Sequence, residues 1–200
     1  MPPRDADATR ARILAAATAE FAEHGLAGGR VDRIAAAART NKAQLYHYFG
    51  NKETLFDLVF DRYVELNVTT DPLDAEHLPE YAASIYDYYL REPVLVRLAT
   101  WARLERTPVG DLFVRSGGID PRVIARIEAA QADGVLVDSV AAIDIFSLTI
   151  GMASSWAQSS LTITATAEEP EDLHARRRAA LEAAVRASFC RRPEPVGERR

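Results

Sequence analysis

The chain has 200 residues, of which 48% are hydrophobic and 26% are charged. This composition is typical of a soluble globular protein with one or two domains, and it excludes a fully disordered chain. No apolar run reaches the ~18 residues that a membrane-spanning helix requires, so we expect no membrane partner. The charged stretch from Met1 to Arg12 has no apolar core, so we expect no signal peptide.

The net charge of −5 is unevenly distributed along the chain. Residues 1–52 contain eight lysines and arginines and five acidic residues, so they carry +3 and the remainder carries −8. A basic N-terminal segment followed by an acidic remainder suits a DNA-binding protein with a separate second function. The single cysteine, Cys190, cannot form an internal disulfide, which favours a cytoplasmic location.

The first predicted helix runs from about Thr9 to His24. Its apolar stripe repeats every four residues, at Ile13, Ala17 and Phe21. We expect Gly25 to end this helix, because glycine adopts the left-handed cap conformation without steric cost. A second, short helix is predicted from Val31 to about Ala38.

A tight turn at Arg39 and Thr40 should lead into a third short helix, from about Asn41 to Tyr48. We expect Gly50 to stop this helix. A fourth helix should follow directly, with the side-chain oxygen of Asn51 accepting a hydrogen bond from its first turn.

Helical patterns continue to the end of the chain, so we predict an all-α fold. Further helices are expected at about 80–91, 94–106, 121–133, 138–161 and 171–190. The helix at 138–161 is apolar around most of its circumference and should be buried on most sides. The predicted organisation is a disordered arm at 1–8, a helix-turn-helix DNA-binding domain at 9–60, a larger helical domain for ligand binding and dimerisation at 61–191, and a disordered tail at 192–200.

Two short helices joined by a tight turn are typical of the DNA-binding helix-turn-helix. In the second helix of the pair, Leu45 and Phe49 share the packing side, and the remaining arc presents Lys42, Gln44, Tyr46 and His47. Glutamine can pair with adenine, and lysine with guanine, through base-edge hydrogen bonds. A tyrosine hydroxyl suits a phosphate oxygen, and so does Lys52 at the start of the next helix. The arc is therefore predicted to read bases and to bind the DNA backbone.

The stretches Arg30–Ala35 and Leu45–Leu55 resemble the tetracycline-repressor (TetR) family, through the pattern Leu-Tyr-x-Tyr-Phe-x-x-Lys-x-x-Leu after a short Ile-Ala helix. The resemblance covers about residues 9–60. It implies an all-helical homodimer whose last two long helices form a four-helix bundle and whose middle helices enclose a ligand pocket. It also implies DNA contacts at the matching positions, which are Arg30, Arg33, Lys42, Ala43, Gln44, Tyr46 and Lys52.

Two positions depart from the family's usual pattern. The family usually has Ser or Thr where Arg30 stands, so Gly29 or Arg30 must cap the second helix. Its turn is usually glycine followed by an apolar residue, and a left-handed arginine at that point costs roughly 1–2 kcal/mol. The remaining candidate DNA contacts are Arg39, His47 and Tyr48. The last two could instead be an exposed filler residue and a packing residue.

Aromatic side chains later in the chain suggest a ligand pocket. The candidate lining residues are Tyr86, Tyr89, Trp101, Arg103 and Phe113. This composition suits a flat, mainly apolar small molecule. The alternative is that these side chains are core residues, as aromatic stripes at helical spacing usually are.

The helix at 138–161 and the last helix carry the predicted dimer interface. An apolar helix in a chain of this size can pack one side on its own domain, and its other side then needs a partner. Two such helices from each subunit would form a four-helix interface around a two-fold axis. The assigned residues are Phe146, Ile150, Ala153, Ala157, Leu181, Ala184, Val185 and Phe189.

The sequence gives no sign of an active site. The four histidines lack metal-ligand spacing, and neither a glycine-rich phosphate loop nor a G-x-S-x-G motif is present. We therefore expect no catalytic residue, cofactor or metal. The favoured interpretation is a repressor that binds a palindromic operator as a dimer and is released by a small molecule, with an activator left open. The alternatives are a helical interaction protein that has lost DNA binding, and an enzyme.

Overall fold

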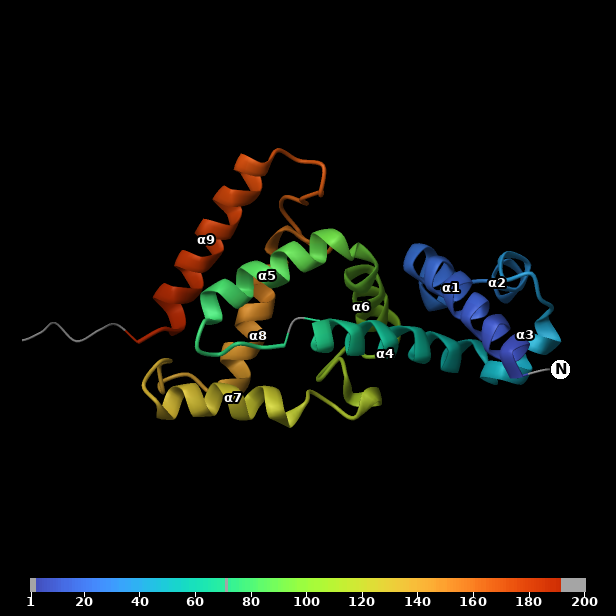
Figure 1. Cartoon of the computed structure of the whole chain (residues 1–200), viewed down its shortest axis with the longest axis horizontal. Helices are drawn as coiled ribbons and strands as arrows, with labels where there is room; N and C mark the ends of the chain where they lie inside the picture. Colours follow the sequence, from blue (N-terminus) through green and yellow to red (C-terminus); the bar gives the residue numbers. More distant parts are fainter. Residues whose placement is uncertain (1–2, 71, 192–200) are drawn as a thin grey trace, which may run out of the picture. The chain divides into compact units, whose positions relative to one another are not determined.

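The computed structural model describes residues 3–70 and 72–191 (Figure 1). Within this part of the chain the structure is all helical, as predicted. The α-helices are α1 (Pro3–Gly28), α2 (Val31–Ala37), α3 (Lys42–Phe49), α4 (Lys52–Thr70), α5 (Leu78–Arg91), α6 (Pro93–Glu105), α7 (Pro121–Ala132), α8 (Ala142–Ala153) and α9 (Glu171–Phe189). Short 3-10 turns, η1 (Val114–Ser116) and η2 (Ser154–Trp156), lie after α6 and α8.

Packing divides the chain into two compact units. Unit 1 comprises Met1–Thr70 and Glu92–Ile119, and unit 2 comprises Asp71–Arg91 and Asp120–Arg200. The boundary that the sequence suggested near residue 60 does not mark this division, because α6 packs against α1 and α4. The chain therefore passes between the units at residues 70–71, 91–92 and 119–120.

The core of unit 1 forms around the apolar stripe of α1. Ile13 and Phe21 are fully buried, and the Phe21 ring meets Phe56 of α4 edge-on at 5.2 Å between centroids. Leu45 of α3 and Leu98 of α6 are buried in the same cluster. Unit 1 thus combines the predicted helix-turn-helix region with α6, a helix from later in the chain.

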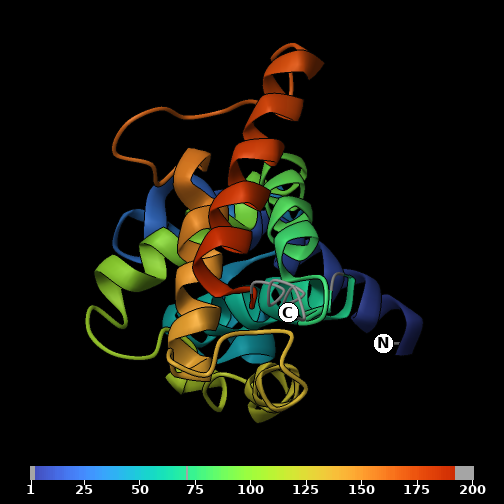
Figure 2. The ribbon, with the colours of Figure 1, turned by 90° about the vertical axis from the view of Figure 1, so that its left-hand side faces the viewer.

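The core of unit 2 joins α5, α7, α8 and α9, with α9 packing against α5 and α8 (Figure 2). Its buried residues include Ile85, Ile145 and Val185. A polar network lies inside this core. The hydroxyl of Tyr86 is 2.8 Å from Nδ1 of His174, and Arg177 donates to the carboxylate of Glu169.

Two helices differ in length from the predictions. Helix α1 begins at Pro3 rather than near Thr9, so residues 3–8 of the expected arm are helical. Helix α8 ends at Ala153, although the sequence predicted a helix to residue 161. Its end coincides with serines that hydrogen-bond to the carbonyl of Gly151, and such side-chain bonds compete with helical ones. The expected tail at 192–200 lies outside the described residues.

Candidate DNA-binding site

The turn between α2 and α3 has left-handed backbone geometry at Arg39, although this geometry is unfavourable for an arginine. Arg39 has φ 53°, and the backbone amide of Thr40 donates to the carbonyl of Ala35 at 2.9 Å. The guanidinium of Arg12 on α1 donates to the carbonyl of Ala38 at 3.2 Å. This contact, which the sequence did not indicate, supports the turn and leaves the side chain of Arg39 exposed.

Helix α3 is fixed at both ends by local signals. The Asn41 side chain accepts a hydrogen bond from the amide of Gln44 at 2.8 Å, and Gly50 ends the helix with φ 76°. Leu45 and Phe49 are buried, as predicted. The side chains of Lys42, Ala43, Tyr46 and His47 are exposed, and those of Gln44 and Tyr48 are half-buried. The predicted reading arc is therefore open to a partner.

The start of α2 is capped from outside the helix. Arg30 makes no side-chain cap, and instead its amide donates to the carboxylate of Glu20 on α1 at 2.8 Å. The same carboxylate accepts from Nε of Arg33 at 2.8 Å. Burial opposes the charge of Glu20, but these hydrogen bonds lower its pKa overall. Glu20 thus replaces the missing Ser or Thr cap, and Arg33 is paired with it.

Three cations of the motif, Arg30, Lys42 and Lys52, line a surface depression of about 640 Å³. Lys42 pairs with Asp32 at 2.7 Å, and the ammonium of Lys52 donates to the carbonyl of Gly29 at 3.1 Å. The side chain of Asn51 caps α4 by accepting from the amide of Thr54 at 2.7 Å, as predicted. The residues lining the depression are Gly29, Arg30, Val31, Asp32, Lys42, Tyr46, Asn51, Lys52 and Glu53. The fold therefore brings Arg30, Lys42, Tyr46 and Lys52 together.

A further cation, Arg10, lies beside the end of the recognition helix. Its guanidinium is 5.7 Å from the centre of the Phe49 ring. No motif indicated this position, because the contact joins residues far apart in the sequence. Arg10 is exposed, so its charge remains available on the same domain as α3.

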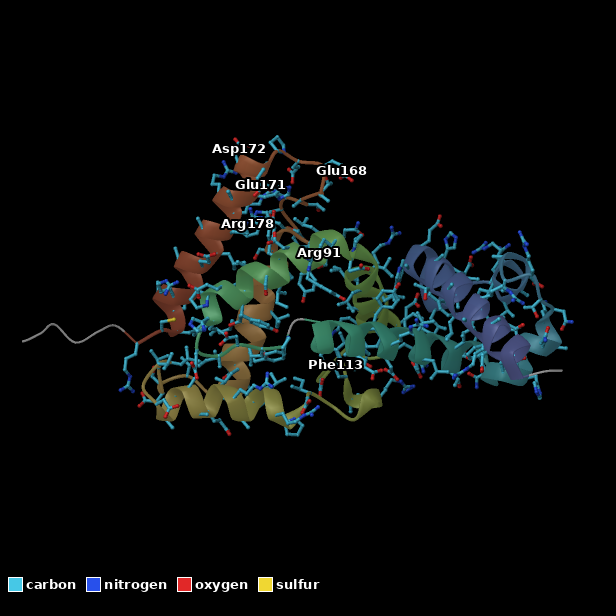
Figure 3. All side chains as sticks on the ribbon, in the orientation of Figure 1. Arg91, Phe113, Glu168, Glu171, Asp172 and Arg178 are labelled. Atoms are coloured by element: carbon cyan, nitrogen blue, oxygen red, sulfur yellow. The ribbon has the colours of Figure 1, made fainter. Side chains whose placement is uncertain are left out.

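The aromatic residues predicted to line a ligand pocket belong to different units. In unit 1, Trp101 contacts α1, and the Phe113 ring (labelled in Figure 3) stacks on Phe60 with 6.1 Å between centroids. Arg103 donates to the carbonyls of Thr107 and Gly110. These contacts give each side chain a structural role within unit 1.

The other two candidate pocket residues lie in unit 2. Tyr86 is buried and bonded to His174, whereas Tyr89 is half-buried. Burial raises the pKa of Tyr89 to about 12, so its hydroxyl stays protonated even in alkaline solution where an exposed tyrosine ionises.

Most of the residues assigned to the dimer interface lie in the core of unit 2. The buried ones are Ala153, Ala157, Leu181, Val185 and Phe189. Phe146 and Ile150 are half-buried, and Ala184 is exposed. Burial leaves the first group no surface to offer a partner. The exposed side of α9 is instead rich in small residues, namely Ala175, Ala179, Ala180, Ala183, Ala184 and Ala187.

The described residues also lack two features of other protein classes. They contain no group of three His, Cys, Asp or Glu side chains placed to bind a metal ion. None of their helices combines the length and the apolar character needed to cross a membrane.

Comparison with known proteins agrees with the geometry of unit 1. Residues 13–59 match the family described as bacterial regulatory proteins, tetR family, and residues 77–187 match the tetracyclin repressor-like C-terminal domain. The chain is 38% identical over 159 residues to the HTH-type transcriptional repressor SCO4008 of Streptomyces coelicolor, covering 78% of this chain and 82% of that protein.

Two further relatives extend the comparison. The HTH-type transcriptional repressor NicS of Pseudomonas putida is 34% identical over 148 residues, covering 68% of this chain and 70% of that one. The crystal structure of the transcriptional regulator SCO4942 from Streptomyces coelicolor superposes with a TM-score of 0.72 at 36% identity. The superposition covers 94% of this chain and 99% of the SCO4942 chain.

Proposed function

The chain belongs to the TetR family of helix-turn-helix transcriptional regulators, and from this we propose that it is a repressor that binds a near-palindromic operator as a homodimer and is released by a small molecule. The family is not enzymatic, and the helix-turn-helix binds DNA. Two of the relatives are repressors by name, which favours repression over activation. We place the protein in the cytoplasm.

The observation that carries the proposal is the open arc of α3 beside the basic depression. An α-helix presented in this way can enter the major groove of B-DNA. We assign base reading to Gln44 and Lys42, with Ala43 allowing close approach. We assign phosphate contacts to Arg30, Arg39, Tyr46, His47, Tyr48 and Lys52. Lys42 must exchange Asp32 for DNA, so its contribution is the difference between two charged partners.

The pairing of Arg33 with Glu20 changes its assignment. Its guanidinium donates to Glu20 and to the carbonyl of Gly28, so it already has acceptors within the domain. Contact with phosphate would compete with these bonds. We therefore propose that Arg33 orients the start of α2 rather than binding the DNA backbone.

The proposed dimer uses the exposed sides of α8 and α9. Ile143 and Leu148 of α8 are 40% and 49% exposed although both are apolar. The exposed alanines of α9 would let a second copy approach closely, as in a four-helix interface. A symmetric dimer could then hold two recognition helices about 34–36 Å apart, one turn of DNA.

We propose that the effector is a flat, mainly apolar molecule bound by the helical C-terminal part of the chain. In unit 2 the candidate contacts remain Tyr86 and Tyr89, which offer aromatic surface, whereas Trp101, Arg103 and Phe113 lie in unit 1 and have partners there. The effector must bind the DNA-free arrangement more tightly than the DNA-bound one, because equal affinity shifts no equilibrium.

Fluorescence anisotropy with the DNA upstream of the protein's own gene tests the proposal. The protein should bind a duplex carrying an inverted repeat at least ~1000-fold more tightly than a scrambled duplex at physiological salt. Equal affinity for both duplexes would refute operator recognition and favour a helical protein that has lost DNA binding.

A further inference from the structure

Helix α1 is broken where it approaches the start of α2. Gly25 has φ 68° and ψ −173°, which no helical residue adopts. The break exposes polar backbone groups, because the carbonyl of Ala22 and the amides of Leu26 and Ala27 lie on either side of it. Such groups require partners from elsewhere in the fold.

One face of α6 supplies all of these partners. Arg97, Trp101 and Glu105 are spaced four residues apart and so share a side of the helix. Arg97 donates to the carbonyl of Ala22 at 2.7 Å, and the indole of Trp101 lies 3.4 Å from the same oxygen.

The carboxylate of Glu105 caps the other side of the break. It accepts from the amide of Leu26 at 2.6 Å and from the amide of Ala27 at 3.0 Å. The Trp101 ring fills the space over Gly25, where an added Cβ would lie 2.7 Å from ring carbons. The three side chains, here called the α6 stripe, therefore match the break in shape and in hydrogen bonding.

The break leads directly to the DNA-binding site. The amide of Gly29 donates to the carbonyl of Gly25 at 3.1 Å, and the carbonyl of Gly29 accepts from Lys52. Gly29 is also tightly enclosed, because an added Cβ would lie 2.8 Å from the oxygen of Gly25. A shift at the break must therefore move the start of α2 and the partner of Lys52.

We propose that the α6 stripe is a positioning element that holds α2 and α3 in the arrangement that binds DNA, with Glu105 as its central residue. This inference rests on the proposed function. Residues 92–119 pack in unit 1 but are joined by the chain to unit 2 at both ends.

Substitution of Glu105 in the full-length protein tests the proposal. Glu105→Ala leaves both amides without their carboxylate, and operator affinity should fall about tenfold at a temperature where the variant is fully folded. Glu105→Gln keeps an acceptor oxygen and should recover most of the affinity. The control is Glu128→Ala on α7, which removes an exposed carboxylate from unit 2 and should bind like the wild type.

A spectroscopic readout separates positioning from a contribution to stability. The chain has two tryptophans, so in Trp156→Phe the only indole is Trp101, inside the stripe. Adding Glu105→Ala should shift its emission to the red. Because coupling is reciprocal, saturating operator DNA should move the emission back towards that of Trp156→Phe.

The outcomes are distinct. If the wild-type protein binds the operator and Glu105→Ala binds it equally well, the inference is overturned while the proposed function stands. The inference is also overturned, and the proposed function still stands, if operator DNA leaves the Trp101 emission of the Trp156→Phe, Glu105→Ala double variant unchanged. If the wild-type protein discriminates no DNA sequence, both are overturned.

Discussion

In unit 1 two half-buried carboxylates, Glu20 and Glu105, cap backbone amides of a neighbouring helix, whereas in unit 2 a polar network runs through the core. Glu20 caps α2 and Glu105 caps the break in α1, each bonding backbone amides. In unit 2, Arg177 is 5% exposed and links Glu169 to the hydroxyl of Tyr86. Next to it, Nε2 of His174 is buried without a hydrogen-bond partner among the described residues.

The difference suggests which substitutions each unit tolerates without unfolding. Carboxylates that cap helices fix the direction of short elements, so their loss should change DNA binding before it unfolds the domain. A polar network inside a core is costly to break, because the remaining groups lose their partners in a poorly solvated place. Substitutions in the two units should therefore separate recognition from stability.

The largest effect is expected at the proposed dimer face. Leu148→Glu places a charge on an exposed apolar position of α8, so the subunit should stay folded while the dimer dissociates. Operator affinity should fall at least ~100-fold, because the second half-site is no longer held near the first. Sedimentation velocity and anisotropy measure the two changes.

Phe189→Glu is the contrasting variant for this prediction. Phe189 is buried in the core of unit 2, so a carboxylate there should unfold the unit rather than produce a folded monomer. A dimeric Leu148→Glu protein with normal operator affinity would contradict the assignment of the α8 face.

The next effect is expected from the network in unit 2. Arg177→Ala should lower the free energy of unfolding by about 2–3 kcal/mol, somewhat less than for a completely buried pair, because Glu169 is partly exposed. Arg176→Ala, at the exposed neighbouring position, should change it by less than ~0.5 kcal/mol. Urea unfolding measures both. Equal stability of the two variants would show that the network contributes nothing.

The same pair predicts a dependence on pH. The hydrogen bond from Arg177 lowers the pKa of Glu169, although burial acts in the opposite direction. A carboxylate with a lowered pKa in the folded state stabilises it above its unfolded pKa, and that contribution is lost as the pH falls through the folded value. The stability difference between the wild type and Arg177→Ala should therefore shrink under acidic conditions, as urea titrations across that range would show.

A smaller effect is expected in recognition. Gln44→Ala should weaken operator binding by ~1–3 kcal/mol and relax the preference at one position in each half-site. Its stability should change little, because the side chain is only half-buried and the one hydrogen bond lost, from the hydroxyl of Thr40, leaves a donor that water can reach. Selection from a randomised operator measures the preference, and an unchanged consensus would remove Gln44 from the base-reading residues.

Local signals in the sequence predicted the helix-turn-helix closely. Gly25 and Arg39 have the left-handed φ angles that the turns required, Gly50 ends α3, and Asn51 caps α4. Each of these depends on a few neighbouring residues, which a sequence displays directly. The caps supplied by Glu20 and Glu105 were not predicted, because their partners lie 10 and 79 residues away from them.

The proposed dimer interface shows a second limit of prediction from the sequence. Large apolar residues of α9 such as Leu181 and Phe189 were assigned to the interface, but packing within unit 2 buries them. Hydrophobicity indicates that a side chain will be covered without indicating which surface covers it. The exposed side carries alanines, whose weak apolar signal does not separate an interface from a solvated helix.

The smallest effects are expected from two cations of the DNA-binding site that differ in their partners. Lys52 donates to a carbonyl oxygen, whereas Arg33 is paired with the carboxylate of Glu20. Lys52→Ala should weaken binding to all sequences about equally and reduce the slope of log affinity against log salt by about one for each phosphate that the lysine no longer neutralises. Arg33→Gln should leave that slope unchanged and lower the melting temperature slightly, because Glu20 loses a charged partner. Anisotropy titrations at several salt concentrations, with thermal unfolding of the same samples, make the comparison. A reduced slope in Arg33→Gln would show that this arginine leaves Glu20 for a phosphate when DNA binds.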